Sequence, residues 1–384
     1  MKKILFTFIL ILSFISYVES LSFSPDGRYI VSGNILRGTD EYSMEAIIRI
    51  WDTETGQQIR SFSAGGAWGI SLVFSPDSSK IISVTNWSES TNVILWDVAS
   101  GKIIREMGSL GAHCGGSSIE FNSNGSQIIS GSWEGTVKIH DISTGREIRT
   151  FSGNPLSFSP DGRQVLSVDG NIYIRGNTIR LWDVSTGCEI RTFSGNFASF
   201  SPDGRQILFI DGNTIKLWDM AKGREIKTFF TGSSVFTCLF NPDIRHIVSR
   251  HIDNKVITKL WNIETGREAI TFSGYIVSFS PDGKQMLSVD GNKIKLWDVS
   301  TGREIRPFSG NSALFSPDGR QFLFSSWDEG IINLWDISTS RVIRTFSGNS
   351  ALFSPDGSKM LTSDDDTIKL WDTATGKEIA QLKH

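Results

Sequence analysis

The sequence is poor in the residues that build metal sites, disulfide frameworks and nucleic-acid surfaces. It contains only 5 His and 3 Cys among 384 residues, and its formal net charge is −3. The histidines show no metal-ligand spacing, and the near-neutral charge argues against a general attraction to nucleic acid or an anionic membrane. We therefore expect no metal, no cofactor and no nucleic-acid partner. Cys114, Cys188 and Cys238 fall at different places in the repeat described below, so no intramolecular disulfide is expected.

Long hydrophobic runs are also lacking, with one exception at the N-terminus. Two lysines precede a charge-free apolar run from Ile4 to Val18. The run is shorter than the roughly 20 residues that a membrane-spanning helix needs. Its length and basic flank are typical of a secretory signal peptide. We expect residues 1–20 to be removed after Ser20, and 21–384 to be exported to the periplasm or the extracellular space. The alternatives are an uncleaved N-terminal membrane anchor and a buried strand of the fold.

What the rest of the chain has in abundance is one repeated pattern, seen most clearly from Ser278 to Phe308. Its four short apolar runs are separated by turn residues: a Pro-Asp-Gly turn at Pro281, an Asp-Gly pair at Gly291, and a turn that ends at Gly302. We expect antiparallel strands at 278–280, 285–289, 293–297 and 304–308. A meander of this size cannot bury both of its faces alone, so the units must pack against one another.

Nine such units follow one another, and each contains a Trp-Asp dipeptide or a close variant of it. These dipeptides are Trp51-Asp52, Trp96-Asp97, His140-Asp141, Trp182-Asp183, Trp218-Asp219, Trp261-Asn262, Trp297-Asp298, Trp335-Asp336 and Trp371-Asp372. A Ser-Pro-Asp-Gly turn, intact or degraded, precedes each of them. The units resemble WD40 repeats, a family in which one repeat forms one blade of a β-propeller. The resemblance implies an all-β fold, a single closed and monomeric propeller of nine four-stranded antiparallel blades over 21–384. Eight blades plus an extra unit is the alternative.

The repeated aromatic and acidic residues are expected to be structural. The Phe before each Ser-Pro-Asp-Gly turn and the Trp of each Trp-Asp pair should fill the seams between blades. The Asp after the Trp should accept backbone N–H groups of the next turn. The family usually carries Gly-His before the first strand, whereas this chain has Gly-Asn, as at Gly195-Asn196. The hydrogen-bond network that such a His joins is therefore not expected in the same form.

Candidate binding residues come from the units that depart from the repeat. The connection between the second and third strands is lengthened in units 1, 2 and 4, where the extra residues are 34–45, 86–92 and 171–176. The connection into unit 3 is also long. In such a meander these connections emerge on one face, so the long loops of units 1–4 should share one sector of it. Four tryptophans lie outside the repeated position, in or beside loops of this face: Trp68, Trp87, Trp133 and Trp327.

Exposed Trp, Tyr and Arg side chains are the usual anchors of an interface. The predicted partner-binding residues are Trp68, Trp87, Trp133, Arg37, Tyr42, Tyr173 and His113. The competing interpretation is that each of these tryptophans merely covers its own hairpin.

These observations favour a non-catalytic WD40-repeat scaffold that binds a protein or peptide through the long-loop face of units 1–4. A propeller enzyme, lactonase-like or quinone-dependent dehydrogenase-like, is the alternative, with its site at the central channel. The predicted inner strands offer mainly Ser, Ala, Leu and Val, whereas such a site needs converging carboxylates and histidines. No catalytic residue is predicted. A purely structural component of the cell envelope is a third reading.

Overall fold

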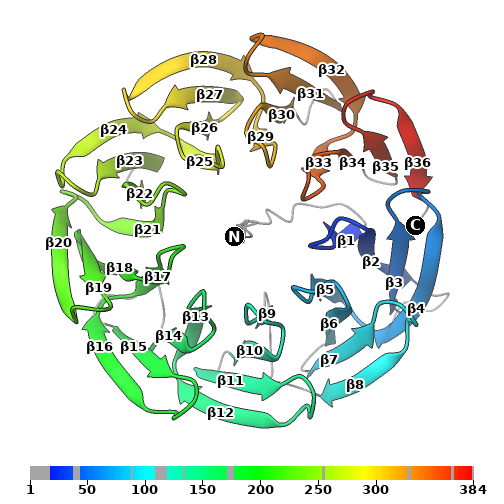
Figure 1. Cartoon of the computed structure of the whole chain (residues 1–384), viewed down its shortest axis with the longest axis horizontal. Helices are drawn as coiled ribbons and strands as arrows, with labels where there is room; N and C mark the ends of the chain where they lie inside the picture. Colours follow the sequence, from blue (N-terminus) through cyan, green and yellow to red (C-terminus); the bar gives the residue numbers. More distant parts are fainter. Residues whose placement is uncertain are drawn as a thin grey trace.

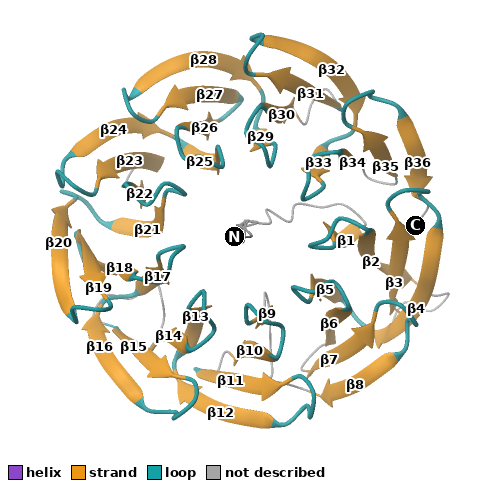
Figure 2. Cartoon of the chain, in the orientation of Figure 1, coloured by secondary structure: helices purple, strands orange, loops and turns teal. Residues whose placement is uncertain are grey.

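The computed structural model describes residues 18–37, 44–87, 90–108, 119–132, 135–170, 177–252, 256–326, 330–364 and 367–382. The described residues form nine four-stranded antiparallel sheets arranged in a ring and contain no helix (Figures 1 and 2). Each sheet uses four consecutive strands, so every blade is one continuous stretch of chain. The predicted propeller of nine blades is confirmed. No helix in the described residues is long and apolar enough to cross a membrane.

The blades are numbered in chain order, and in each the first strand lies nearest the centre of the ring (Figure 1). Blades 1 to 3 are formed by β1 (Val18–Phe23), β2 (Tyr29–Arg37), β3 (Met44–Asp52), β4 (Gln58–Gly66); β5 (Gly69–Phe74), β6 (Lys80–Trp87), β7 (Ser90–Asp97), β8 (Ile103–Gly108); and β9 (Ile119–Phe121), β10 (Gln127–Ser132), β11 (Thr136–Asp141), β12 (Glu147–Ser152). Blades 4 to 6 are formed by β13 (Asn154–Phe158), β14 (Gln164–Val168), β15 (Thr178–Asp183), β16 (Glu189–Ser194); β17 (Phe197–Phe200), β18 (Gln206–Asp211), β19 (Thr214–Asp219), β20 (Arg224–Phe230); and β21 (Val235–Phe240), β22 (His246–Ile252), β23 (Val256–Asn262), β24 (Glu268–Ser273). Blades 7 to 9 are formed by β25 (Tyr275–Phe279), β26 (Gln285–Asp290), β27 (Lys293–Asp298), β28 (Arg303–Ser309); β29 (Ser312–Phe315), β30 (Gln321–Ser326), β31 (Ile331–Asp336), β32 (Arg341–Ser347); and β33 (Ser350–Phe353), β34 (Lys359–Ser363), β35 (Ile368–Asp372), β36 (Glu378–Leu382).

Turn chemistry fixes two of the connections in each blade, the one between the first and second strands and the one between the third and fourth. In the Ser-Pro-Asp-Gly turn of blade 7, Ser280 Oγ donates to Asp282 Oδ1 at 2.8 Å and accepts the backbone N–H of Gln285 at 2.9 Å. Gly283 takes the positive φ, 69°, that completes this turn. After the Trp, Asp298 Oδ1 accepts the backbone N–H of Thr301 at 2.7 Å, which confirms the predicted capping role. The four predicted strands of this unit are present as β25–β28.

The hairpins of the second and third strands in blades 1 and 2 are longer than the sequence predicted. The extra residues of these units were expected to form loops, but β2 and β3 are each 9 residues long, and β6 and β7 are each 8. Backbone pairing continues to Arg37↔Met44 in blade 1 and to Trp87↔Ser90 in blade 2. Most of the added length therefore extends the sheet, because alternating ladder partners are still available on both strands. The extra residues of blade 4, 171–176, lie outside the described residues.

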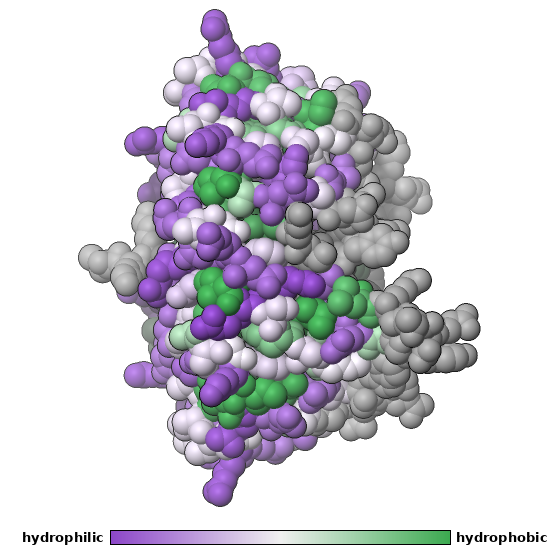
Figure 3. Space-filling model, turned by 90° about the vertical axis from the view of Figure 1, so that its right-hand side faces the viewer, coloured by the Kyte–Doolittle hydropathy of each residue, from purple (hydrophilic) through white to green (hydrophobic). Residues whose placement is uncertain are grey.

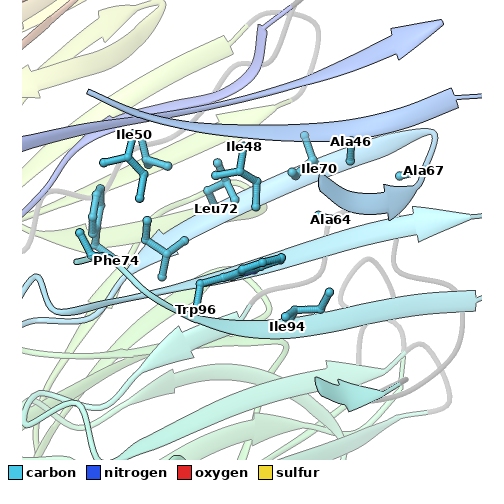
Figure 4. Packing of buried hydrophobic residues seen from close by; sticks show 13 residues of the cluster. Ala46, Ile48, Ile50, Ala64, Ala67, Ile70, Leu72, Phe74, Ile94 and Trp96 are labelled. Carbon is cyan, nitrogen blue, oxygen red and sulfur yellow. The ribbon is translucent and has the colours of Figure 1, made fainter. Parts of the chain in front are cut away.

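The hydrophobic core consists of separate clusters at the seams between neighbouring blades. At the first seam, Ile48 and Ile50 of β3 point toward Leu72 and Phe74 of β5 (Figure 4). Blade 9 packs on blade 1 in the same way, with Leu370 against Trp51. Lys359 of blade 9 also donates to Glu54 of blade 1 at 2.8 Å. The repeated Trp and Phe residues are thus buried or half-buried at seams, as predicted.

Two further contacts join successive blades. The Trp of one blade packs against the strand-4 Phe of the preceding blade, edge-on in several blades and stacked in Phe272–Trp297, whose ring centroids are 5.1 Å apart. A basic residue of strand 4 reaches a backbone carbonyl in the last turn of the next blade. Arg149 Nη2, for example, donates to Ser185 O at 2.8 Å. Arg60, Arg105, Lys227 and Arg344 make the equivalent bond.

The indole N–H of the Trp is satisfied inside its own blade. In six blades it donates to a hydroxyl on the second strand, as Trp297 Nε1 does to Ser288 Oγ at 2.8 Å. The Gly-Asn pairs take no part in these bonds; Asn154 Nδ2 instead donates to Gly170 O. A histidine joins only in blade 6, where His251 lies between Ser233 and Ser249. The expectation of an altered network is correct for the described residues.

β1 overlaps the end of the predicted signal peptide. It begins at Val18, and its pairing with β2 runs from Val18↔Asn34 to Phe23↔Ile30. Cleavage after Ser20 would leave residues 21–23 in the strand. The remaining strand would be as long as β9, which has 3 residues and forms the inner strand of blade 3.

Candidate functional site

The meander gives the ring two faces that carry different connections. The first-to-second and third-to-fourth strand turns lie on one face, which we call the turn face. The second-to-third strand connections and the links from one blade to the next lie on the opposite face, which we call the loop face. Between them, the rim is a belt of hydrophilic surface interrupted by small apolar patches (Figure 3). Exposed residues of outer strands, such as Ile103 and Ile104 of β8, contribute to this rim.

Trp68 is the predicted partner-binding residue whose side chain the structure describes. It lies in the short link between β4 and β5 and is 58 % exposed. Its backbone N–H donates to Asn86 O at 2.7 Å, and the N–H of the fully buried Ala67 donates to Met44 O at 3.3 Å. These bonds fix the link to the extended hairpins of blades 1 and 2. The indole is therefore presented to solvent from a rigid position, which is what an interface anchor requires.

The other predicted partner-binding residues have side chains outside the described part of the chain. Arg37 is the last residue of β2 and Trp87 the last of β6, so both backbones are on the loop face, but their side chains lie outside the described part of the chain. The remaining predicted residues, Trp133, Tyr42, Tyr173 and His113, also lie outside it, as does Trp327. Trp68 and the ends of β2 and β6 lie on the loop face of blades 1 and 2, and the binding role of the predicted residues stays a prediction.

Sequence reasoning missed two exposed aromatic residues on another sector of the loop face. Phe230, the last residue of β20, is 79 % exposed, and Phe236 in β21 is 43 % exposed. The signal was present in the repeat: Phe230 stands where blades 4 and 7 have Ser194 and Ser309. An aromatic residue replacing an exposed serine has no packing role in the blade.

The turn face carries many carboxylates, but their hydrogen bonds are used by the fold. Side-chain donation from Ser185, followed by the backbone N–H of Thr186, lowers the pKa of Asp183 from 3.8 to about 2. An open cleft of ≈ 880 Å³ lies between blades 4 and 5 on this face, lined by both acidic and basic residues, including Asp183, Arg205 and Lys222. Because Asp183 already accepts bonds from its own turn, it is poorly placed for acid–base work.

Metal and thiol chemistry find little support in the described residues. No group of three or more His, Cys, Asp or Glu side chains there is arranged to hold a metal ion. Cys238 is buried in β21, and burial raises the pKa of its thiol, so it is a poor nucleophile. Cys188 is exposed in a turn, as predicted, and Cys114 lies outside the described residues. Burial also raises the pKa of Glu120 in β9.

The fold defines the protein as a β-propeller built from tandem four-stranded repeats. The family profile "WD domain, G-beta repeat" matches residues 9–52, 104–141, 270–298 and 340–372. The C-terminal WD40 domain of Sif2 superposes with a TM-score of 0.55 at 14 % sequence identity, covering 91 % of this chain and 93 % of that domain. Four segments of this chain are thus matched as WD40 repeats, and the other five blades have the same four-stranded fold.

The related proteins match this chain only over part of their own length. An uncharacterised WD repeat-containing protein of Deinococcus radiodurans is 24 % identical over 40 % of this chain and 66 % of its own length. The periodic tryptophan protein 2 homologue of Schizosaccharomyces pombe is 32 % identical over 30 % of this chain and 14 % of its own. The small ribosomal subunit protein RACK1z of rice is 26 % identical over 33 % and 35 %, respectively. The matched segments thus span at most 66 % of these relatives. WD40 propellers are typically protein-interaction scaffolds, and nothing among these matches points to an enzyme.

Proposed function

We propose that this chain is a non-catalytic scaffold that binds a protein or peptide partner through the loop face of blades 1–4. The observation that carries the proposal is Trp68, 58 % exposed on a link whose backbone is bonded to two neighbouring blades. A large aromatic surface held rigidly loses little entropy on binding, and burying it contributes roughly 2–3 kcal/mol. The extended β2–β3 and β6–β7 hairpins flank it and enlarge the surface available to a partner.

We further propose that the scaffold acts outside the cytoplasm, exported by residues 1–20 as a cleaved signal. The support is the basic, apolar and short character of that segment. Mass measurement and N-terminal sequencing of the mature protein test this step. The expected first residue is Leu21; an intact Met1 on a membrane-bound protein would instead identify an anchor.

The binding proposal is tested by affinity capture from the exported fraction, with quantitative mass spectrometry. Three forms of the full chain are compared: the wild type, Trp68→Ala, and a triple variant in which Trp68, Trp87 and Trp133 are all alanine. The captured partner should fall by about tenfold or more for Trp68→Ala and be lost in the triple variant, because the buried aromatic anchor is removed.

Ile305→Ala is the matched control, since Ile305 is a large apolar residue, 49 % exposed, on the rim of blade 7. Its variant should capture the partner as the wild type does. Equal capture by the wild type and the folded triple variant would refute the proposed surface.

A further inference from the structure

Blade 6 carries an arginine at a position that the other blades fill with small or apolar residues. Arg250 lies in β22, opposite Thr237 of β21 and Thr258 of β23. The same register position holds Gly33, Val84, Gly131, Val168, Ile210, Val289, Ser325 and Ser363 in the other eight blades. Val168 and Val289 there are 0 % and 1 % exposed and pack into seams. A guanidinium therefore stands in blade 6 where four blades carry an aliphatic side chain and the other four carry Gly or Ser.

The surroundings of Arg250 do not neutralise its charge. Its guanidinium carbon lies 4.7 Å from the centroid of the Phe236 ring, a cation–π contact. Tyr275, the first residue of β25 in blade 7, interacts with it electrostatically. Arg250 Nε is buried without a hydrogen-bond partner, and no described carboxylate lies within 4 Å of the guanidinium. Burial lowers the pKa of Arg250, in keeping with a charge that lacks compensation.

The neighbouring departures from the repeat are all aromatic. Phe236 and Tyr275 each stand four residues before the last Phe of the inner strand, and four other blades have an Asn there: Asn154, Asn196, Asn311 and Asn349. Phe230, which replaces a Ser, ends β20 just before the link into β21. β21 and β22 pair within blade 6, and β25 is the inner strand of the next blade, blade 7, whereas β20 is the outermost strand of blade 5 (Figure 1). Arg250, Phe236 and Tyr275 thus form a cluster at the loop face of blades 6 and 7, which we call the Arg250 cluster.

We propose that the Arg250 cluster is a second binding site, which takes an acidic segment of a protein partner, a Glu or Asp carboxylate next to an apolar side chain. The unpaired guanidinium supplies the forked donors that a carboxylate accepts. Phe236, which is 43 % exposed, supplies the apolar surface for the adjoining side chain. An arginine stacked on an aromatic ring in a partly desolvated position is typical of an interface hot spot.

Local charge favours a single carboxylate over a polyanion. The other described cation at this seam, Lys259, is already paired with Glu268 at 3.0 Å and donates to Thr231 O. Nucleic acid is bound through several phosphate contacts at once, which need several free cations. The cluster offers one guanidinium. The site is separate from Trp68, which lies between blades 1 and 2, so it stands whether or not the blade 1–4 surface binds a partner.

The test starts from a random heptapeptide display selection against the full chain. The most enriched peptide is then made in two fluorescein-labelled forms, with its acidic residue and with the corresponding amide, and titrated by fluorescence anisotropy. Two variants return the cluster to residues found in other blades: Arg250→Val and Phe236→Asn. These residues already occur at the matching positions, so the fold should tolerate them.

Peptides with a carboxylate beside an aromatic or aliphatic residue should be enriched. Arg250→Val and the amide form of the peptide should each raise Kd by about tenfold to a hundredfold, the range for a hydrogen bond to a charged group. Arg250→Val tested with the amide form of the peptide should raise Kd little more than either change alone, because both changes remove the same contact. Phe236→Asn should weaken both forms of the peptide by a similar factor, and it serves as the second probe if Arg250→Val does not fold.

Arg205→Gln is the charge-matched control, since Arg205 is an 85 % exposed cation on the turn face, and it should bind as the wild type does. Three results would overturn the proposal: no peptide enriched, enriched peptides without a carboxylate, or equal affinity of the wild type and Arg250→Val. A fluorescein-labelled dT12 probe completes the set. Binding of that probe which is lost in Arg250→Val, with peptide binding unaffected, would assign the cluster to nucleic acid.

Discussion

The bond between the seam tryptophan and the second-strand hydroxyl gives a sharp test of what holds a blade together. Trp297 Nε1 donates to Ser288 Oγ at 2.8 Å, and the two side chains are 8 % and 2 % exposed. Trp297 also stacks on Phe272 of the preceding blade, so the same side chain connects a bond within blade 7 to a contact between blades. Ser288→Ala deletes the acceptor and leaves a buried indole N–H without a partner.

We expect Ser288→Ala to lower the free energy of unfolding by about 1–3 kcal/mol, since an unsatisfied buried donor costs more than the net value of the bond. Trp297→Phe should cost about as much or more, because it also removes apolar contact area. In the double variant the two effects should be non-additive by about 1 kcal/mol, the bond they share.

The measurement is urea denaturation of the four proteins of this cycle, followed by tryptophan fluorescence and by circular dichroism. Coinciding curves and equal m-values justify comparing the free energies. Ser312→Ala is the control: Ser312 is an exposed serine at the start of β29, and its variant should lie within about 0.5 kcal/mol of the wild type. The reasoning fails if Ser288→Ala matches that control, or if the two effects in the cycle simply add.

Three further outcomes follow from described contacts. Asp183, with its pKa lowered to about 2, contributes stability that is fully present above pH 3.8 and is lost as pH falls toward 2. Asp183→Asn should flatten the fall of Tm over that interval, since Asn262 already holds the same turn in blade 6 without a charge. An unchanged dependence of Tm on pH would contradict this. Iodoacetamide should alkylate Cys188 in the native protein and Cys238 only after unfolding, because burial raises the pKa of the Cys238 thiol; peptide mass mapping decides, and equal native labelling would be the contrary result. Arg149→Ala should lower stability by about 1 kcal/mol by removing the bond to the next blade, and a denaturation midpoint equal to that of the wild type would show that the bond is dispensable.

The local chemistry of the repeat was readable from sequence. Pro281, Asp282 and Gly283 specify a turn whatever surrounds them, and the alternation in 293–297 specifies a half-buried strand. The role of Asp298 as a cap could also be predicted, because its partners are within a few residues. Residues 34–37 and 44–45 of the added length of blade 1 were wrongly predicted to be loop, because strand and loop can share a composition and only pairing with a partner strand distinguishes them.

The candidate sites were less predictable than the framework. Trp68 could be found because tryptophan is rare outside the repeated position. Arg250 could not be singled out by type, since the chain holds many arginines and most of those in the fourth strands serve the fold. Its meaning depends on Phe236 and on Tyr275, which belongs to the next blade.

The sequence by itself determined that this protein is a tandem array of four-stranded units with aromatic residues at their seams, because turn residues and strand periodicity act over a few positions. Only the tertiary structure decided which departures from the repeat become neighbours. Ring packing brings residues from consecutive blades to one face. Whether a charged side chain there is neutralised depends on neighbours from other blades, and their proximity cannot be inferred from the order of the sequence.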